Sequence, residues 1–141
     1  MEKEFTILIA DRNSRVRKFL KREMMEEGYK VRLAENGRDV LKWVYHHEPL
    51  DLLILDTDLP DVDELSLSKG LQDRIPALPV VVHTYLSDCD VSSTVWSTAV
   101  FVEKKGSSVE RLKKVISDIL HKPGFQEIKT EKEAESNSSE I

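Results

Sequence analysis

Short apolar runs and stretches of helical periodicity alternate along the first 121 residues of the chain. The apolar runs cover residues 5–10, 51–56, 79–84 and 100–102, and a further run with alternating apolar and polar positions covers residues 29–34. A continuous apolar run predicts a central strand of a parallel sheet that is covered on both faces, whereas alternation is typical of a strand nearer the edge. The pattern therefore predicts five strands.

Helical spacing follows four of these five strands. Apolar residues recur at steps of three and four over residues 14–27, 38–47, 63–75 and 107–120. The first helix is expected to have Ser14 as its cap and to end at Gly28. The segment between residues 84 and 100 is rich in serine, threonine and valine, so we expect a short or irregular helix there.

The alternation of strands and helices also predicts the architecture. Successive βα units favour a parallel sheet with right-handed crossovers and helices on both faces. Five units form an α/β, doubly wound, five-stranded parallel sheet of the flavodoxin-like type, with its site at the carboxyl ends of the strands. We expect residues 1–121 to form this domain. Residues 122–141 carry few apolar side chains and are expected to form a flexible polar C-terminal tail.

Composition narrows the classes of function. The 141 residues are 40% hydrophobic and 33% charged, and the formal net charge of -5 argues against direct DNA binding. The single cysteine, Cys89, excludes an intrachain disulfide and a cysteine metal cluster. The sequence has neither a signal-peptide pattern nor an apolar stretch of about 18 residues that would span a membrane. We therefore expect a cytoplasmic protein with no membrane partner.

Four of the predicted strands end in groups that suit phosphoryl transfer. Asp11 follows the first strand and Asp56 the third, Thr84 ends the fourth, and Lys104 follows the fifth. A carboxylate can attack phosphorus, Mg²⁺ held by oxygen ligands can neutralise charge, and an ammonium and a hydroxyl can bind the remaining oxygens. Each residue alone is more typical of a turn, a helix cap or a solvated charge than of a functional site. Their joint placement at neighbouring strand ends predicts a phosphoryl-transfer site.

The sequence around these strand ends resembles the receiver domain of two-component response regulators. ILIADRNSRVRKFL resembles the first strand and helix of that family, and LLILDTDLPDVDEL resembles its phosphoacceptor strand and loop. PVVVHT resembles the strand that ends in a serine or threonine, and FVEKKGSSVERL resembles the lysine-bearing strand and last helix. The resemblance extends from residue 5 to residue 121, which is nearly the whole predicted domain.

This resemblance implies a role for each matched residue. Asp56 would be the phosphoacceptor, Lys104 the phosphate-binding lysine and Thr84 the switch hydroxyl. Phe101 would be the aromatic residue that changes rotamer with the switch. The implied ligands of Mg²⁺ are Asp11, Asp56 and the main-chain carbonyl of Asp58.

Two positions depart from the family pattern. Arg12 stands where the family has a second acid that touches the metal, so Mg²⁺ should bind more weakly here. The Arg12 guanidinium either substitutes in part for the cation beside Asp56 or turns out to solvent. Lys105 replaces the usual proline after the lysine, and we expect a trans peptide before it because a non-proline cis bond costs about 2.5–4 kcal/mol.

These features predict a stand-alone, atypical receiver, which is a signalling domain with at most self-phosphorylation and dephosphorylation activity. A histidine kinase or phosphotransfer protein would supply the phosphoryl group, and an unknown downstream protein would read the result. The predicted output face consists of residues 87–98, the strand at 100–102 and the last helix, where a homodimer could also form.

Two other functions remain open from the sequence. A pseudo-receiver would bind partners without phosphorylation, and Arg12 and Lys105 favour this alternative. A hydrolase on the same fold would need a residue that activates water near Asp56. Glu103 is the only close candidate, and strand alternation predicts that it points away from the site.

Overall fold

Residues 4–45, 49–61, 64–73, 78–85 and 99–121 are the part of the chain that the computed structural model describes. Its strands and helices are, in chain order, β1 (Thr6–Ala10), α1 (Ser14–Glu26), β2 (Lys30–Ala34), α2 (Gly37–Val44), β3 (Leu52–Leu55), α3 (Glu64–Gln72), β4 (Val80–Thr84), β5 (Val100–Glu103) and α4 (Ser108–His121). Every strand predicted from the apolar runs is present, and so is each helix predicted from helical spacing. The irregular helix expected between residues 84 and 100 and the polar tail at 122–141 lie outside the described residues. Within the described ranges, no helix is long and apolar enough to cross a membrane.

The strands form one parallel sheet in the order β2-β1-β3-β4-β5. This order confirms the doubly wound, flavodoxin-like fold class. β2 lies at an edge, as its alternating sequence indicates, whereas β1 and β3 lie inside the sheet and are buried along their whole length. The central position predicted for the run at 100–102 is wrong, because β5 lies at the other edge and is only partly buried. β2 pairs with one edge of β1 and β3 with its other edge, so the strand order reverses its direction at β1. The ends of β1 and β3 are therefore neighbours, and folds of this type carry their sites at that position.

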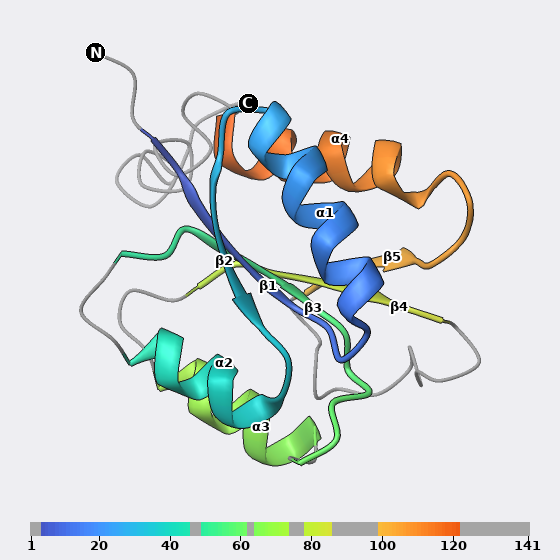
Figure 1. The fold of residues 1–141 in the computed structure, drawn as a ribbon. Helices are drawn as coiled ribbons and strands as arrows, with labels where there is room; N and C mark the ends of the chain where they lie inside the picture. Colours follow the sequence, from blue (N-terminus) through green and yellow to red (C-terminus); the bar gives the residue numbers. More distant parts are fainter. Residues whose placement is uncertain (1–3, 46–48, 62–63, 74–77, 86–98, 122–141) are drawn as a thin grey trace, which may run out of the picture.

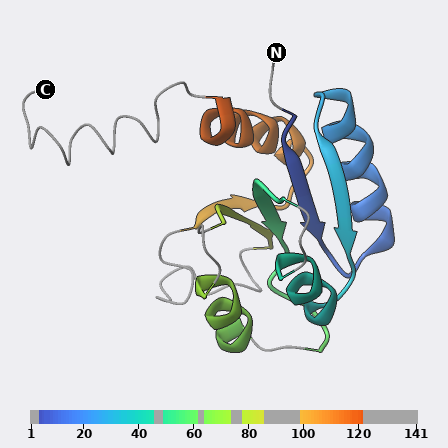
Figure 2. The ribbon, with the colours of Figure 1, turned by 90° about the vertical axis from the view of Figure 1, so that its left-hand side faces the viewer.

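Helices cover both faces of the sheet, with α1 and α4 on one side and α2 and α3 on the other (Figure 1 and Figure 2). Alternate residues of β1 serve the two layers. Ile7 and Ile9 pack in the cluster with buried residues of α1 and α4, whereas Leu8 and Ala10 pack in the cluster with those of α2 and α3. Because an interior strand is buried on both faces, most of its positions must be apolar, and this explains the continuous runs in the sequence.

The start of α1 corrects one expectation from the sequence. Asn13, and not Ser14, is the N-cap, because its side-chain oxygen accepts hydrogen bonds from the main-chain N–H groups of the next turn. The donors are Arg15, at 2.9 Å, and Val16, at 3.3 Å. Asn13 has the extended backbone that a cap needs, while Ser14 is already helical. Gly28 follows the helix as predicted, with a φ of 97° in the left-handed region that glycine tolerates best.

Candidate functional site

The carboxyl ends of β1, β3, β4 and β5 bring four of the predicted residues together. Asp11 and Asp56 follow neighbouring strands, and the main-chain N–H of Asp56 donates to the carbonyl of Ala10 at 2.9 Å. On the next strands, the N–H of Lys104 donates to the carbonyl of Thr84, also at 2.9 Å. These main-chain bonds continue the parallel pairing one residue beyond the ends of β3 and β5. The sheet therefore sets the spacing between the main chains that carry these side chains.

Lys104 joins the two buried carboxylates. Its Nζ lies 2.8 Å from Asp11 Oδ2 and 3.1 Å from Asp56 Oδ2, and at most a tenth of each of the three side chains is exposed. The second oxygen of Asp56, Oδ1, accepts a hydrogen bond from Thr84 Oγ1 at 3.3 Å and one from the main-chain N–H of Asp58 at 3.0 Å. Both oxygens of Asp56 thus have partners, which hold its carboxylate in one orientation.

Burial and ion pairing act in opposite senses on the charged groups. Burial alone would lower the pKa of Lys104, but its hydrogen bond to Asp11 and the charges of both acids raise that pKa above its ordinary value. Burial raises the pKa of Asp11, while hydrogen bonds from Lys104 and from the Asn13 main-chain N–H oppose this effect. Lys104 therefore stays protonated between the two acids. From this position its ammonium can bind the oxygen atoms that gain negative charge when the site reacts.

This arrangement suits transfer of a phosphoryl group to Asp56. The Asp56 carboxylate can act as the nucleophile, and the donors already aimed at its oxygens can bind the oxygens of an incoming phosphoryl group. Phosphoryl transfer depends mainly on positioning and on stabilisation of negative charge. Lys104 and Thr84 supply a cation and a hydroxyl from two different strands, at the distances given above.

Arg12 has a partner that neither sequence interpretation foresaw. Its Nη2 lies 3.0 Å from Asp58 Oδ2, and both side chains are about half exposed. The guanidinium is therefore neither turned out alone into solvent nor paired with Asp56. Instead it links the loop after β1 to the loop after β3, beside the cluster of Lys104 and the acids.

The site contains oxygen donors of the kind that hold a divalent cation. Asp11 and Asp56 converge, and Mg²⁺ prefers carboxylate and carbonyl oxygens together with several waters. However, the facing oxygens of these two acids already bind Lys104, and Arg12 engages the side chain of Asp58. In the described ranges, no group of three or more His, Cys, Asp or Glu side chains could hold a metal ion. A cation here would depend on two carboxylates, a main-chain carbonyl and water.

Two supporting contacts are missed by sequence reasoning. Arg17 donates from Nη1 to the main-chain carbonyl of Asp11 at 2.6 Å, which holds the loop after β1. Asp61, in the loop after β3, accepts hydrogen bonds from the N–H groups of Gly37, at 2.7 Å, and Arg38, at 3.1 Å, and so caps α2. Asp61 lies more than twenty residues from its partners, so no local pattern could reveal this contact.

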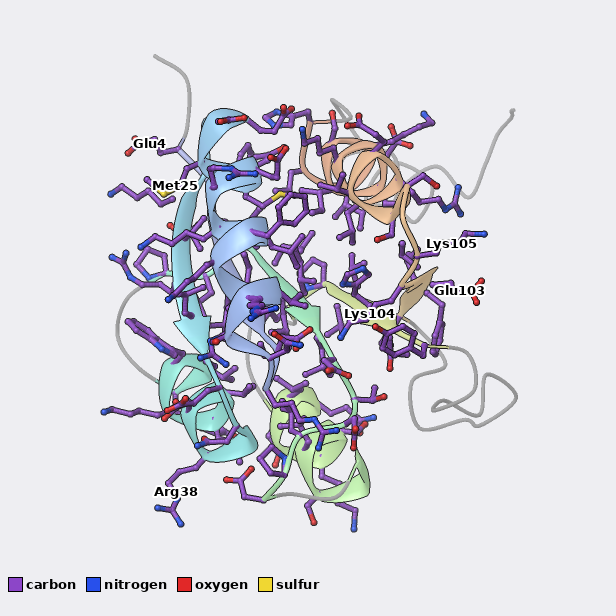
Figure 3. The ribbon with its side chains drawn as sticks, turned by 45° about the vertical axis from the view of Figure 1, so that its right-hand side comes forward. Glu4, Met25, Arg38, Glu103, Lys104 and Lys105 are labelled. Carbon is purple, nitrogen blue, oxygen red and sulfur yellow. The ribbon has the colours of Figure 1, made fainter. Side chains whose placement is uncertain are left out.

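The remaining predicted residues lie around β5. Figure 3 shows the Lys104 side chain directed inward, while Glu103 and Lys105 point outward and pair with one another at 3.8 Å. Glu103 thus points away from the acids, as strand alternation predicts. Phe101 is half-buried and packs against the core cluster on the α2 and α3 side.

Comparison with protein families and curated proteins gives a consistent result. The family model described as response regulator receiver domain matches residues 7–117. The chain is 35% identical over 95 residues to the DNA-binding transcriptional regulator NtrC of Proteus hauseri, which is 67% of this chain and 20% of that protein. It is 35% identical over 78 residues to the response regulator MprA of Mycolicibacterium vanbaalenii, which is 55% of this chain and 33% of that protein. The chain thus spans about a fifth of the length of the NtrC protein it matches.

Solved structures show the same fold. The response regulator protein TrrA of Thermotoga maritima, solved in complex with Mg²⁺ and BeF, has a TM-score of 0.71 and 27% identity. The match covers 82% of this chain and 99% of that chain. The signal receiver domain of a LuxO repressor protein from Vibrio parahaemolyticus has a TM-score of 0.75 at 20% identity, over 89% of this chain and 97% of that chain. At that identity the second match supports the fold alone.

Proposed function

The chain belongs to the response regulator receiver domain family, and from this we propose that it is a signalling domain that accepts a phosphoryl group on Asp56. The donor would be the phosphohistidine of a histidine kinase or of a phosphotransfer protein. The observation that carries this proposal is the convergence of Lys104 and Thr84 on the two oxygens of Asp56. A cytoplasmic location is part of the same proposal.

In the proposed reaction, one Asp56 oxygen forms a bond to phosphorus as the bond from phosphorus to the donor nitrogen breaks. Lys104 and Thr84 would then exchange contacts with the carboxylate for contacts with the phosphoryl oxygens. When bound, Mg²⁺ would add charge neutralisation, held by Asp11, Asp56 and the main-chain carbonyl of Asp58. Arg12 would make this binding weaker than an acid at the same position allows.

The output would be a protein contact controlled by a two-state element. Movement of the Thr84 hydroxyl toward the phosphoryl group would open space beside β4, and Phe101 on the adjacent strand would change its packing. The altered face would include β5 and α4, which could bind a downstream protein or a second copy of the chain. The domain would therefore act by binding partners and not by catalysing a reaction on a substrate of its own.

The proposal is tested by intact-mass spectrometry after incubation with phosphoramidate and Mg²⁺. Wild type should gain one phosphoryl group, and Asp56→Ala should gain none. Asp118→Ala is a matched control, because this aspartate lies on α4 and pairs only with the exposed Lys114 in the described structure. Equal labelling of wild type and Asp56→Ala would reject Asp56 as the acceptor.

A second candidate function is a pseudo-receiver that binds partners without phosphorylation. The ion pairs of the site favour this alternative. Lys104 pairs with Asp11 and Asp56, and Arg12 pairs with Asp58, without a phosphoryl group. Under this alternative no phosphodonor would modify the chain. Asp56→Asn would then leave partner binding unchanged.

A further inference from the structure

The ion pair between Arg12 and Asp58 involves a residue that also binds the proposed phosphoacceptor through its main chain. Asp58 lies two residues after Asp56, and its main-chain N–H donates to Asp56 Oδ1 at 3.0 Å. The side chain of the same residue holds the Arg12 guanidinium at 3.0 Å. The guanidinium is therefore anchored to the residue whose N–H binds the acceptor carboxylate.

The side chain of Arg12 is two charge units more positive than an acidic side chain at the same position would be. A carboxylate carries one negative charge and a guanidinium one positive charge, so the difference equals the charge of one Mg²⁺ ion. Lys104 already supplies a second cation, 3.1 Å from Asp56. A phosphoryl group carries about -1.5 to -2 charges near neutral pH, and because Lys104 also pairs with Asp11, the Arg12 guanidinium would supply the further positive charge.

The present contact of Arg12 can be exchanged at low cost. Both side chains of the pair are about half exposed, and ion pairs of this kind contribute little to stability. Arginine has a planar fork of N–H donors that matches the oxygens of a phosphoryl group in a bidentate manner. A phosphoryl group on Asp56 would offer a more highly charged partner than the Asp58 carboxylate does.

We propose that Arg12 takes over the charge role of the divalent cation: when Asp56 is phosphorylated, the guanidinium leaves Asp58 and binds the phosphoryl oxygens. The domain then accepts a phosphoryl group without Mg²⁺. This inference rests on the proposed function of Asp56 as acceptor. With phosphoramidate as donor, the new oxygen–phosphorus bond forms as the phosphorus–nitrogen bond breaks, and the already protonated nitrogen leaves as ammonia.

The test compares phosphorylation rates by intact-mass spectrometry with phosphoramidate, in excess EDTA and in excess Mg²⁺. Wild type should react at similar rates in both. Arg12→Gln, which keeps most of the side-chain length, should react about 10- to 100-fold more slowly in EDTA, the effect of one lost charge-assisted contact. Arg12→Asp should react only with Mg²⁺. Arg38→Gln is the control for charge, because Figure 3 shows this exposed arginine directed away from Lys104.

A second readout does not depend on phosphorylation. Titration calorimetry with Mg²⁺ alone should show clear binding to Arg12→Asp and much weaker binding to wild type. Circular dichroism and the unfolding midpoint of each variant establish that it is folded. Arg12→Lys, which keeps the charge but not the bidentate fork, should react in EDTA at a rate between wild type and Arg12→Gln.

Three results would overturn the inference. In the first, wild type requires Mg²⁺ as strictly as Arg12→Asp does. In the second, Arg12→Gln reacts as fast as wild type in EDTA, so the guanidinium contributes nothing. In the third, no variant is modified under either condition, and then the proposed function of Asp56 fails together with this inference. The first two results leave that proposed function intact.

Discussion

At the scale of single residues, Lys104 is the group on which the site depends most. Its ammonium lies between two carboxylates that are almost fully buried, and the centroid of the Tyr85 ring lies 5.4 Å from it. Removal of one partner from a buried ion pair leaves an uncompensated charge, which costs far more than the pair itself contributes. Here the removal of one cation would leave two acids facing one another.

Lys104→Gln should therefore lower the free energy of unfolding at pH 7 by about 3 kcal/mol. Lys105→Gln is the matched control, because its ammonium is mostly exposed and lies 3.8 Å from Glu103, so its effect should stay within about 0.5 kcal/mol. Urea unfolding measures both values. The deficit of Lys104→Gln should shrink in acid, since protonation of Asp11 removes the repulsion. Equal effects of the two substitutions would contradict the assigned network.

His83 predicts a separate dependence of stability on pH. Its Nε2 lies 3.1 Å from Ser108 Oγ, and burial, helped by the charge of Lys104, lowers its pKa from 6.5 to about 4. Between these two pH values His83 is protonated in the unfolded chain but neutral in the folded chain. The free energy of unfolding therefore falls as the pH is lowered from 6.5 toward 4. The loss attributable to His83 should be about 2 kcal/mol between pH 7 and pH 5.

The measurement for His83 is urea unfolding of wild type and His83→Gln at both pH values. The variant cannot titrate at this position, so the free energy by which wild type exceeds it should be about 2 kcal/mol smaller at pH 5 than at pH 7. A difference that does not change with pH would mean that the folded histidine binds its proton as readily as the unfolded one.

At the scale of elements, the contacts between α2, α3 and the loop after β3 explain how the acceptor loop is held. Asp61 caps α2 from that loop, and Tyr45 Oη donates to the carbonyl of Gly70 in α3 at 2.7 Å. A Cβ at Gly70 would lie 2.6 Å from Leu41 Cδ2, so the glycine lets the two helices approach closely. Gly70 weakens α3 as a helix former but allows this packing.

Asp61→Ala should lower the urea midpoint of unfolding, because two N–H groups at the start of α2 lose their acceptor. Asp61→Asn should have a smaller effect, since it keeps one side-chain oxygen. Partial desolvation would raise the pKa of Asp61, but the hydrogen bonds from Gly37 and Arg38 lower it on balance. The cap therefore stabilises the folded chain fully above the ordinary pKa of an aspartate. This stabilisation is lost as the pH falls through the lowered pKa of Asp61. A midpoint for Asp61→Ala equal to that of wild type would reject the cap.

At the scale of the whole molecule, sequence predicts what depends on burial and misses what depends on single polar contacts. The interior strands β1, β3 and β4 follow from continuous apolar runs, because burial on both faces involves most residues of an interior strand. The run at 100–102 is too short to decide the position of its strand, and β5 lies at an edge. The convergence of Asp11, Asp56 and Lys104 follows from strand ends alone. The ion pair of Arg12 with Asp58 does not, because an exposed pair is decided by less than about 1 kcal/mol and leaves no pattern in the chain.

The same reasoning predicts how a signal would cross the molecule. Thr84 Oγ1 contacts Asp56 Oδ1 at 3.3 Å, and Thr84 is paired with Glu103 across the β4–β5 ladder, so the hydroxyl links the acceptor to β5 beside the direct contact of Lys104. If phosphorylation moves this hydroxyl toward the phosphoryl group, Thr84→Val should still be phosphorylated on Asp56 but should show a smaller response of β5. Valine keeps the branched Cβ of threonine but lacks its hydroxyl, so the hydrogen bond to Asp56 is lost.

Amide chemical shifts of residues 100–103, recorded before and after phosphorylation, measure this response. The shifts should be large in wild type and in Thr84→Ser, because both have the hydroxyl, and smaller in Thr84→Val, where only the contact of Lys104 remains. Residues 30–34 of β2 provide an internal control, since β2 lies at the opposite edge of the sheet from β5. Because a ligand shifts an equilibrium only through contacts that differ between the two states, a shift of β5 in Thr84→Val equal to that of wild type would assign the link to another residue.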